Sequence, residues 1–173
     1  IYFLAQHATP RINDFFIRCQ LVTAIILGLS HGTNDAQKSM GIIVLGLVIS
    51  GRLQSFEVPL WVTVASAASM AIGTSLAGWK IIRTLGGKFY KIRPLHSFAT
   101  QLTSGIVILS ASFFGAPVST SHVVSSAIIG VGASERLSKV RWRVAGDILT
   151  AWLITIPVSA AFAAGFYWLL TSL

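Results

Sequence analysis

The sequence Ser-His-Gly-Thr-Asn-Asp-Ala-Gln-Lys-Ser occupies residues Ser30–Ser39 and separates two apolar runs, Leu21–Leu29 and Met40–Ile49. We call it the polar block. If both runs lie in a bilayer, Asp35 is near the membrane centre, where an ionisable side chain costs roughly 3 kcal/mol on insertion scales and persists mainly where it lines a pathway or a site. The polar block therefore predicts a functional site inside a membrane protein. The alternative is an ordinary helix cap between two separate helices.

The composition agrees with a membrane location. Hydrophobic residues make up 54% of the 173 residues and charged residues 10%, whereas about a quarter of the residues in soluble domains are charged. The net charge of +8 comes from Lys and Arg between the apolar runs, and no nucleic-acid-binding module is visible. We therefore expect the lipid bilayer as a partner, and no nucleic acid. The single cysteine, Cys19, excludes an internal disulfide.

The lengths of the apolar runs predict an all-α membrane protein with a single transmembrane domain over residues 1–173. The chain begins at Ile1 without a visible signal sequence, and we expect it to be a fragment of a longer protein. The expected elements are a broken helix over 15–50, a span over 59–78, a cytoplasmic basic loop over 79–95, a helical hairpin over 98–132 and a final span over 144–170.

Two of these elements are irregular. Residues 15–50 are too many for one straight span of about 20 residues, and each half is too short to cross alone. We therefore expect two half-helices joined at an unwound polar block. The apolar pieces on either side of 115–122 are also short, and basic segments flank both, so the chain is expected to leave and return on one side as a re-entrant hairpin.

The basic residues also predict the orientation. Lys and Arg are concentrated in 79–95 and in 135–143, and cytoplasmic loops carry an excess of such residues. Counting crossings from these loops places the C-terminus on the extracytoplasmic side.

The polar block supplies the first set of candidate site residues. Asp35 offers a carboxylate for Na⁺ or carries a proton, and Asn34 offers a donor and an acceptor beside it. Thr33 and Ser39 add hydroxyl groups that suit an oxyanion or a hard cation. Lys38 either pairs with a substrate charge or forms an ion pair with Asp35 one helical turn away.

The segment before the second hairpin arm supplies the other set. Pro117 suits the first turn of a helix, so Ser119, Thr120 and Ser121 are expected where hydroxyls and unpaired amides converge on a tetrahedral oxyanion. The alternative is hydrogen bonding between helices. His122 and Gln101 are secondary candidates for the cavity lining. No metal-ligand cluster, phosphate-binding loop or hydrolytic triad is visible in the sequence, so we expect no enzyme, no cofactor and no metal site.

Two motifs resemble a known family. Gly32-Thr33-Asn34-Asp35-Ala36, followed by Lys38 and Gly41, and Pro117–His122, followed by Gly130-Val131-Gly132, are similar to the paired signatures of the PiT (Pho4) family of inorganic phosphate transporters, in the order of the family's C-terminal half. The resemblance implies one repeat of a transporter built from two inverted repeats, with an N-terminal repeat as the missing partner. Some relatives have an acidic residue in the next helix, but Ser66–Ala77 has none, so residues around Met70 inherit no ion-binding role.

The form of the polar block is similar to that of bacterial low-affinity Pit-type permeases. This resemblance implies cation-coupled secondary transport of inorganic phosphate across a bacterial inner membrane, with phosphate held between the two motifs and the cation at Asn34 and Asp35. It favours H⁺ over Na⁺ as the coupling cation, and allows a metal–phosphate complex as the transported form. The alternatives are a sulfate permease of the same family and a non-transporting membrane subunit whose helix breaks serve packing alone. A homodimer is left open.

Overall fold

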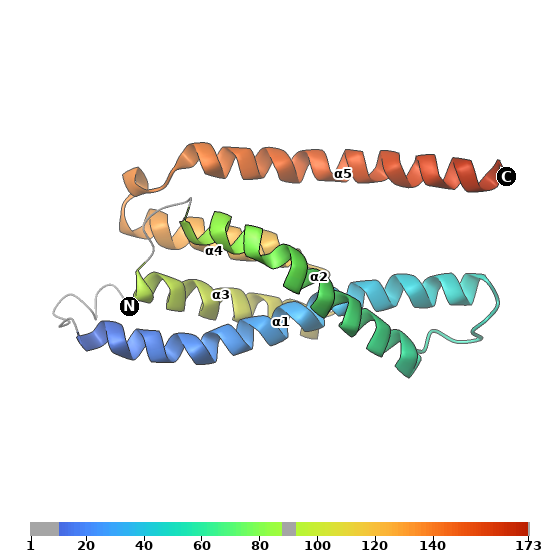
Figure 1. The fold of residues 1–173 in the computed structure, drawn as a ribbon, viewed down its shortest axis with the longest axis horizontal. Coiled ribbons are helices and arrows are strands. Elements are labelled where there is room, and N and C mark those ends of the chain that lie inside the picture. The colour runs from blue at the N-terminus through green and yellow to red at the C-terminus, as the bar shows by residue number, and fades with distance from the viewer. Residues whose placement is uncertain (1–10, 88–92, 173) are drawn as a thin grey trace.

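A computed structural model of the chain describes residues 11–87 and 93–172, and these residues form helices and connections without a strand. The predicted all-α class is thereby confirmed for the described residues. In chain order the elements are α1 (Arg11–Ile49), α2 (Leu60–Gly87), α3 (Pro94–Phe113), α4 (Thr120–Glu135), the short 3-10 helix η1 (Leu137–Lys139) and α5 (Trp142–Thr171) (Figure 1).

The helices lie roughly side by side, with α1 along the length of the molecule (Figure 1). α1 contacts α2, α3 and α4, and α3 packs against α4 as the second arm of a hairpin. α5 lies outside this group and packs on α4 through Val144 and Ile148, which contact the buried Ile128. The best-packed part of the chain is therefore α1 together with the α3–α4 hairpin.

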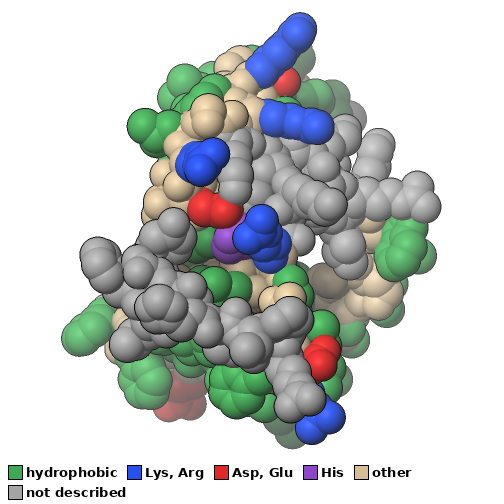
Figure 2. Space-filling model, turned by 90° about the vertical axis from the view of Figure 1, so that its left-hand side faces the viewer, with side chains coloured by type: hydrophobic (Ala, Val, Ile, Leu, Met, Phe, Trp, Pro, Cys, Tyr) green, Lys and Arg blue, Asp and Glu red, His purple; other side chains and the backbone are tan. Residues whose placement is uncertain are grey.

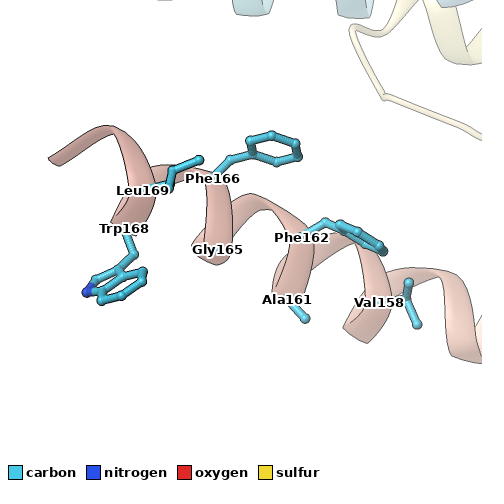
Figure 3. A pocket seen from close by; sticks show the side chains of 7 residues that line it. All are labelled: Val158, Ala161, Phe162, Gly165, Phe166, Trp168 and Leu169. Carbon is cyan, nitrogen blue, oxygen red and sulfur yellow. The ribbon is translucent and has the colours of Figure 1, made fainter. Parts of the chain in front are cut away.

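Two helices among the described residues are long and apolar enough to cross a membrane, Asn13–Ile49 and Trp142–Thr171. They fit the expected membrane protein. None of the most apolar stretch of α5 is buried, and its apolar side chains project from a single helix around a shallow hollow of about 490 Å³ (Figure 3). Such a surface is typical of a helix that faces lipid or another protein segment. The lining residues are Val158, Ala161, Phe162, Gly165, Phe166, Trp168 and Leu169.

The expected break in the first helix is wrong, because α1 is one continuous α-helix from Arg11 to Ile49. Ala36, Gln37 and Lys38 are good helix formers. The hydroxyl groups of Ser30 and Thr33 donate to the carbonyls of Ile26 and Leu29 one turn earlier. At 39 residues α1 is roughly 58 Å long, so it would cross a bilayer tilted or with its ends outside.

Several element boundaries also differ from those expected. α2 continues to Gly87 and α3 begins at Pro94, so the first part of the expected loop over 79–95 is helical; residues 88–92 of that loop lie outside the described residues. Trp79–Leu85 contains no helix breaker, whereas the two glycines that follow are poor helix formers. Pro94 suits the first turn of α3, where its missing N–H is not needed. The hairpin and α5 accordingly begin earlier than 98 and 144.

The turn between α3 and α4 depends on a glycine and a serine. Gly115 has φ +66°, a conformation that residues with a Cβ rarely adopt, and it follows Phe114, the C-cap of α3. Ser119 is the N-cap of α4, and its Oγ accepts a hydrogen bond from the His122 N–H (3.4 Å). These two residues reverse the chain within a few positions and leave the turn opposite the middle of α1 (Figure 1).

The two basic segments meet at one end of the molecule. The C-terminus of α2, the N-terminus of α3, η1 and the start of α5 all lie at the left-hand end of Figure 1. Figure 2 shows this end, where Lys and Arg side chains gather with acidic side chains and a histidine among them. The α1–α2 connection and the C-terminus lie at the opposite end (Figure 1). The structure thus places the predicted cytoplasmic segments on the same side of the chain.

The α1–α3 interface is close and partly polar. A Cβ on Gly105 would lie 3.2 Å from Ile26 Cγ2 and 3.8 Å from the Leu27 nitrogen, so α3 reaches the backbone of α1 at this point. Nearer the basic end, Gln20 Nε2 donates to the Pro94 carbonyl (2.6 Å) and Thr23 Oγ1 donates to Gln101 Oε1 (2.6 Å). A small residue and two hydrogen bonds therefore fix the position of α3 along α1.

Replacing Gly105 with a larger residue should destabilise the protein. We expect Gly105→Val in the full-length protein to cost about 1–3 kcal/mol through overpacking against α1, seen as a lower melting temperature of the purified protein in detergent. Gly73→Val on α2 is the matched control, because no atom lies within 4 Å of a Cβ at Gly73. Equal melting temperatures for the two variants would contradict the proposed close approach.

Candidate functional site

Asp35 is the centre of a hydrogen-bonded cluster on α1. Its Oδ1 lies 2.9 Å from Lys38 Nζ and accepts from Asn34 Nδ2 (3.2 Å), and its Oδ2 lies 2.9 Å from His31 Nε2. His31 and Lys38 are one helical turn before and after Asp35, so a continuous helix aligns all three side chains on one face. Of the two alternatives for Lys38, the structure contains the ion pair with Asp35.

The tip of the α3–α4 hairpin completes this cluster. The Val118 carbonyl accepts hydrogen bonds from Asn34 Nδ2 (2.9 Å) and from Lys38 Nζ, and Thr120 Oγ1 donates to Asp35 Oδ2 (3.1 Å). Asn34 and Thr120 are buried. The two sequence motifs, 85 residues apart at Asp35 and Thr120, are therefore in direct contact.

A cavity adjoins the contact between α1 and the hairpin. It has a volume of about 200 Å³ and is lined by residues of both elements: Asn34, Gln37, Lys38, Gly115, Ala116 and Pro117. Asn34 and Lys38 belong to both the cavity lining and the Asp35 cluster. A small ion in the cavity would therefore be close to a fixed ammonium group and to the hairpin backbone.

The three hydroxyl groups before and within α4 do not point to one place. Thr120 faces Asp35, whereas Ser119 and Ser121 form a hydrogen bond with each other (3.1 Å between their Oγ atoms). Ser121 is exposed and Ser119 half-buried. The three hydroxyl groups therefore do not converge as expected. Thr120 bonds to the Asp35 carboxylate, whereas the two serines bond to each other near the N-terminus of α4.

Other candidates lie away from the cluster. Thr33 is exposed and donates to the Leu29 carbonyl (2.5 Å), and Ser39 donates to the Asp35 carbonyl (3.4 Å), so both bond the backbone of their own helix. Gln101 pairs with Thr23, about three helical turns from Asn34. His122 stacks on Trp152 of α5, with ring centroids 3.9 Å apart. Gln101 and His122 therefore connect helices in this structure.

Two features were missed by sequence reasoning. His31 is not among the site residues expected from the sequence, although its i,i+4 spacing to Asp35 is a usable signal. A second cluster joins the open end of the hairpin: His96 Nε2 lies 3.3 Å from Glu135 Oε2, and Arg93 Nη1 lies 4.0 Å from Glu135 Oε1. Glu135 is far from both residues in sequence, so no local pattern could have indicated this contact.

The site has groups for ions of both signs. The N-terminal turn of α4 has backbone N–H groups without partners in the helix, and its dipole favours an anion. Lys38 adds a positive charge beside the cavity. The Asp35 carboxylate offers oxygen atoms to a cation or a proton. Among residues 11–87 and 93–172, no group of three or more His, Cys, Asp or Glu side chains is placed to hold a metal ion.

Comparison with known proteins gives the relationships of the chain. The family model described as the phosphate transporter family matches residues 3–163. A relative from Bacillus subtilis is 47% identical over 161 residues, which cover 92% of this chain and 48% of the relative. Another, from Rhizobium meliloti, is 44% identical over 166 residues, covering 95% of this chain and 50% of the relative. Both bear the name probable low-affinity inorganic phosphate transporter. No solved structure matches the chain.

The chain spans about half the length of these curated relatives. Their names describe transporters and not enzymes, as expected from the sequence. The family model covers most of the chain, including both motifs that carry the resemblance. This chain therefore belongs to the phosphate transporter family.

Proposed function

We propose that this chain is the C-terminal half of a secondary transporter that carries inorganic phosphate across the bacterial inner membrane. The observation that carries this proposal is the contact of Asn34, Asp35 and Lys38 on α1 with Val118 and Thr120 at the hairpin tip, beside a cavity of about 200 Å³. The names of the relatives support phosphate as the transported ion.

Phosphate binds in this proposal between α1 and the N-terminus of α4. The ammonium group of Lys38 and the free N–H groups at the start of α4 supply positive charge and donors. Ser119 and Ser121 lie close enough to the helix N-terminus to add hydroxyl groups once their mutual hydrogen bond opens. Thr120 acts on Asp35, so its contribution to phosphate binding is through the position of the carboxylate.

The coupling cation is proposed to act at Asp35. His31 and Asp35 form a close pair in which a proton can be held between a carboxylate and an imidazole, and this pairing supports H⁺ over Na⁺. A metal–phosphate complex would bring its own positive charge to the same cavity and agrees with the neighbouring carboxylate. Sulfate is a tetrahedral anion of similar chemistry, but no contact among residues 11–87 and 93–172 favours it over phosphate.

The remaining half of the site is proposed to come from an N-terminal repeat in the same protein. The curated relatives are about twice as long as this chain, and none of the most apolar stretch of α5 is buried by the described residues. In a repeat transporter, small rotations of one half against the other expose a central site to each side in turn. The hairpin is proposed to enter the membrane from the cytoplasmic side and to end at this central site.

Removing the charge of Asp35 tests the proposed coupling. In the full-length transporter, Asp35→Asn should reduce phosphate uptake about 10- to 100-fold, because hydrogen bonds to a charged group contribute roughly 1.5–3 kcal/mol each. Uptake of radiolabelled phosphate into cells that lack other phosphate transporters measures the effect, with protein level checked by immunoblot. The control is Asp147→Asn, which makes the same change at an exposed aspartate of α5. Equal uptake by the two variants would reject Asp35 as the coupling residue.

The hydroxyl groups at the start of α4 have a separate test. We expect Ser119→Ala with Ser121→Ala to raise the KM for phosphate at least about threefold, since a lost hydrogen bond costs roughly 0.5–1.5 kcal/mol. Thr120→Val should lower the maximal rate more than it changes KM, because Thr120 bonds to Asp35. An unchanged KM in the double serine variant would limit these residues to a structural role at the N-cap.

The orientation is testable with two exposed serines at opposite ends of the chain. Ser55 lies in the α1–α2 connection and Ser138 lies in η1 at the basic end. In a full-length background without other reactive cysteines, an impermeant maleimide added outside the cell should label Ser55→Cys rapidly and Ser138→Cys only after permeabilisation. The reverse pattern would invert the proposed topology.

A further inference from the structure

Lys38 occupies the place of a cation in a set of oxygen atoms. Its ammonium group contacts Asp35 Oδ1 at 2.9 Å and also donates to the Val118 carbonyl. Asn34 donates to the same two oxygen atoms. A carboxylate and a backbone carbonyl, brought together from two elements of the chain, are the kind of ligands that hard cations take in proteins.

We propose that Lys38 is a tethered cation that replaces a free alkali cation at this position and so makes anion binding independent of Na⁺. The proposal rests on the phosphate transport proposed above and assigns a specificity-determining role to one side chain. In a protein without this lysine, the same carboxylate and carbonyl oxygens would need a soluble cation to hold them beside a bound anion.

The charges around the cavity explain why a bound anion needs a positive charge beside Asp35. Asp35 and Lys38 form an ion pair of opposite charges, and Lys38 lines the cavity whereas Asp35 is not among its lining residues. An ammonium group has three N–H donors, and the two oxygen contacts leave one for an anion in the cavity. Without Lys38, and with no extra proton on the His31–Asp35 pair, the negative charge of the carboxylate would repel an incoming anion, because a neutral His31 at the other carboxylate oxygen does not cancel that charge. A free cation bound beside Asp35 would then offset the negative charge of the carboxylate.

Tethering gives the lysine an advantage over a soluble ion. The ammonium group is held on α1 one turn from Asp35, so it pays no translational entropy to enter the site and has a high effective concentration there. A soluble Na⁺ must compete with it for the same oxygen atoms. Phosphate uptake by the intact site should therefore change little with Na⁺. Uptake should become dependent on Na⁺ when the charge of Lys38 is removed.

The test uses the full-length transporter in proteoliposomes, with identical pH gradients and with NaCl or choline chloride at equal ionic strength. For the wild type we expect equal phosphate uptake in the two salts. For Lys38→Ala we expect slower uptake in choline and at least about fivefold faster uptake in Na⁺, a ratio within the usual range of coupling between two binding sites. Uptake by Lys38→Ala that is the same in both salts would overturn the proposal.

Two control variants separate charge from other effects. Lys38→Arg keeps the positive charge and should stay independent of Na⁺. Arg18→Ala removes a positive charge from an exposed position of the same helix and should also leave uptake equal in the two salts. Na⁺-dependent uptake in Arg18→Ala would assign the effect to the overall charge of the protein and would overturn the role of Lys38.

A binding measurement keeps the test independent of transport. The melting temperature of purified Lys38→Ala should rise by several degrees in NaCl relative to choline chloride, and that of the wild type should not. Lys38→Met, which keeps most of the side-chain volume, replaces Lys38→Ala if the latter does not fold. Na⁺-specific stabilisation supports the proposal even where uptake by the variant is too slow to measure, and its absence overturns it. Absence of uptake by the wild type would instead reject the proposed function.

Discussion

The Asp35 carboxylate must be matched by donors because it lies in the middle of a long apolar helix. Four side chains meet this requirement: His31, Asn34 and Lys38 from α1, and Thr120 from the start of α4. Three of them come from the helix itself: His31 and Lys38 lie one turn before and after Asp35, and Asn34 is its neighbour in the chain. The fourth requires the hairpin tip to lie against the centre of α1. The position of the hairpin and the hydrogen bonding of the Asp35 carboxylate thus depend on each other.

The rest of the structure brings the hairpin to that position. Gly105 lets α3 approach the backbone of α1, and the hydrogen bonds of Gln20 and Thr23 fix its height along the helix. Gly115 and Ser119 then reverse the chain so that the Val118 carbonyl and Thr120 face the polar block. At the open end of the hairpin, Glu135 on α4 pairs with His96 on α3. The hairpin is consequently held at both of its ends.

This arrangement also explains why the polar block stays helical. Unwinding a helix in a membrane is useful where freed backbone groups must bind an ion. Here the side chains of Asn34 and Lys38 already contact the hairpin backbone, so polar groups of α1 reach the hairpin without opening the helix. A lysine in the block is central to this solution, since its ammonium group neutralises Asp35 locally and remains next to the cavity.

Several residues of the candidate site were predicted from the sequence. The cost of a charge in an apolar run indicated Asp35, and the Pro117–His122 motif indicated a helix N-terminus with hydroxyl groups. Their pairing followed from the resemblance to the family. The break in α1 was predicted wrongly, because run length and composition alone cannot tell whether polar side chains will be satisfied within a helix. The hydrogen bond of Gln101 with Thr23 was not predictable, because Thr23 lies on another helix.

The sequence by itself determined the helical membrane class, the two motifs and the concentration of basic residues in two segments, since each is a property of local composition and periodicity. The tertiary structure alone decided that Val118 offers its carbonyl to Lys38, that Thr120 turns away from Ser119 and Ser121, and that His96 meets Glu135. These contacts join residues that are distant in the chain. Their geometry depends on how closely α3 and α4 pack against α1, and no local pattern encodes that distance.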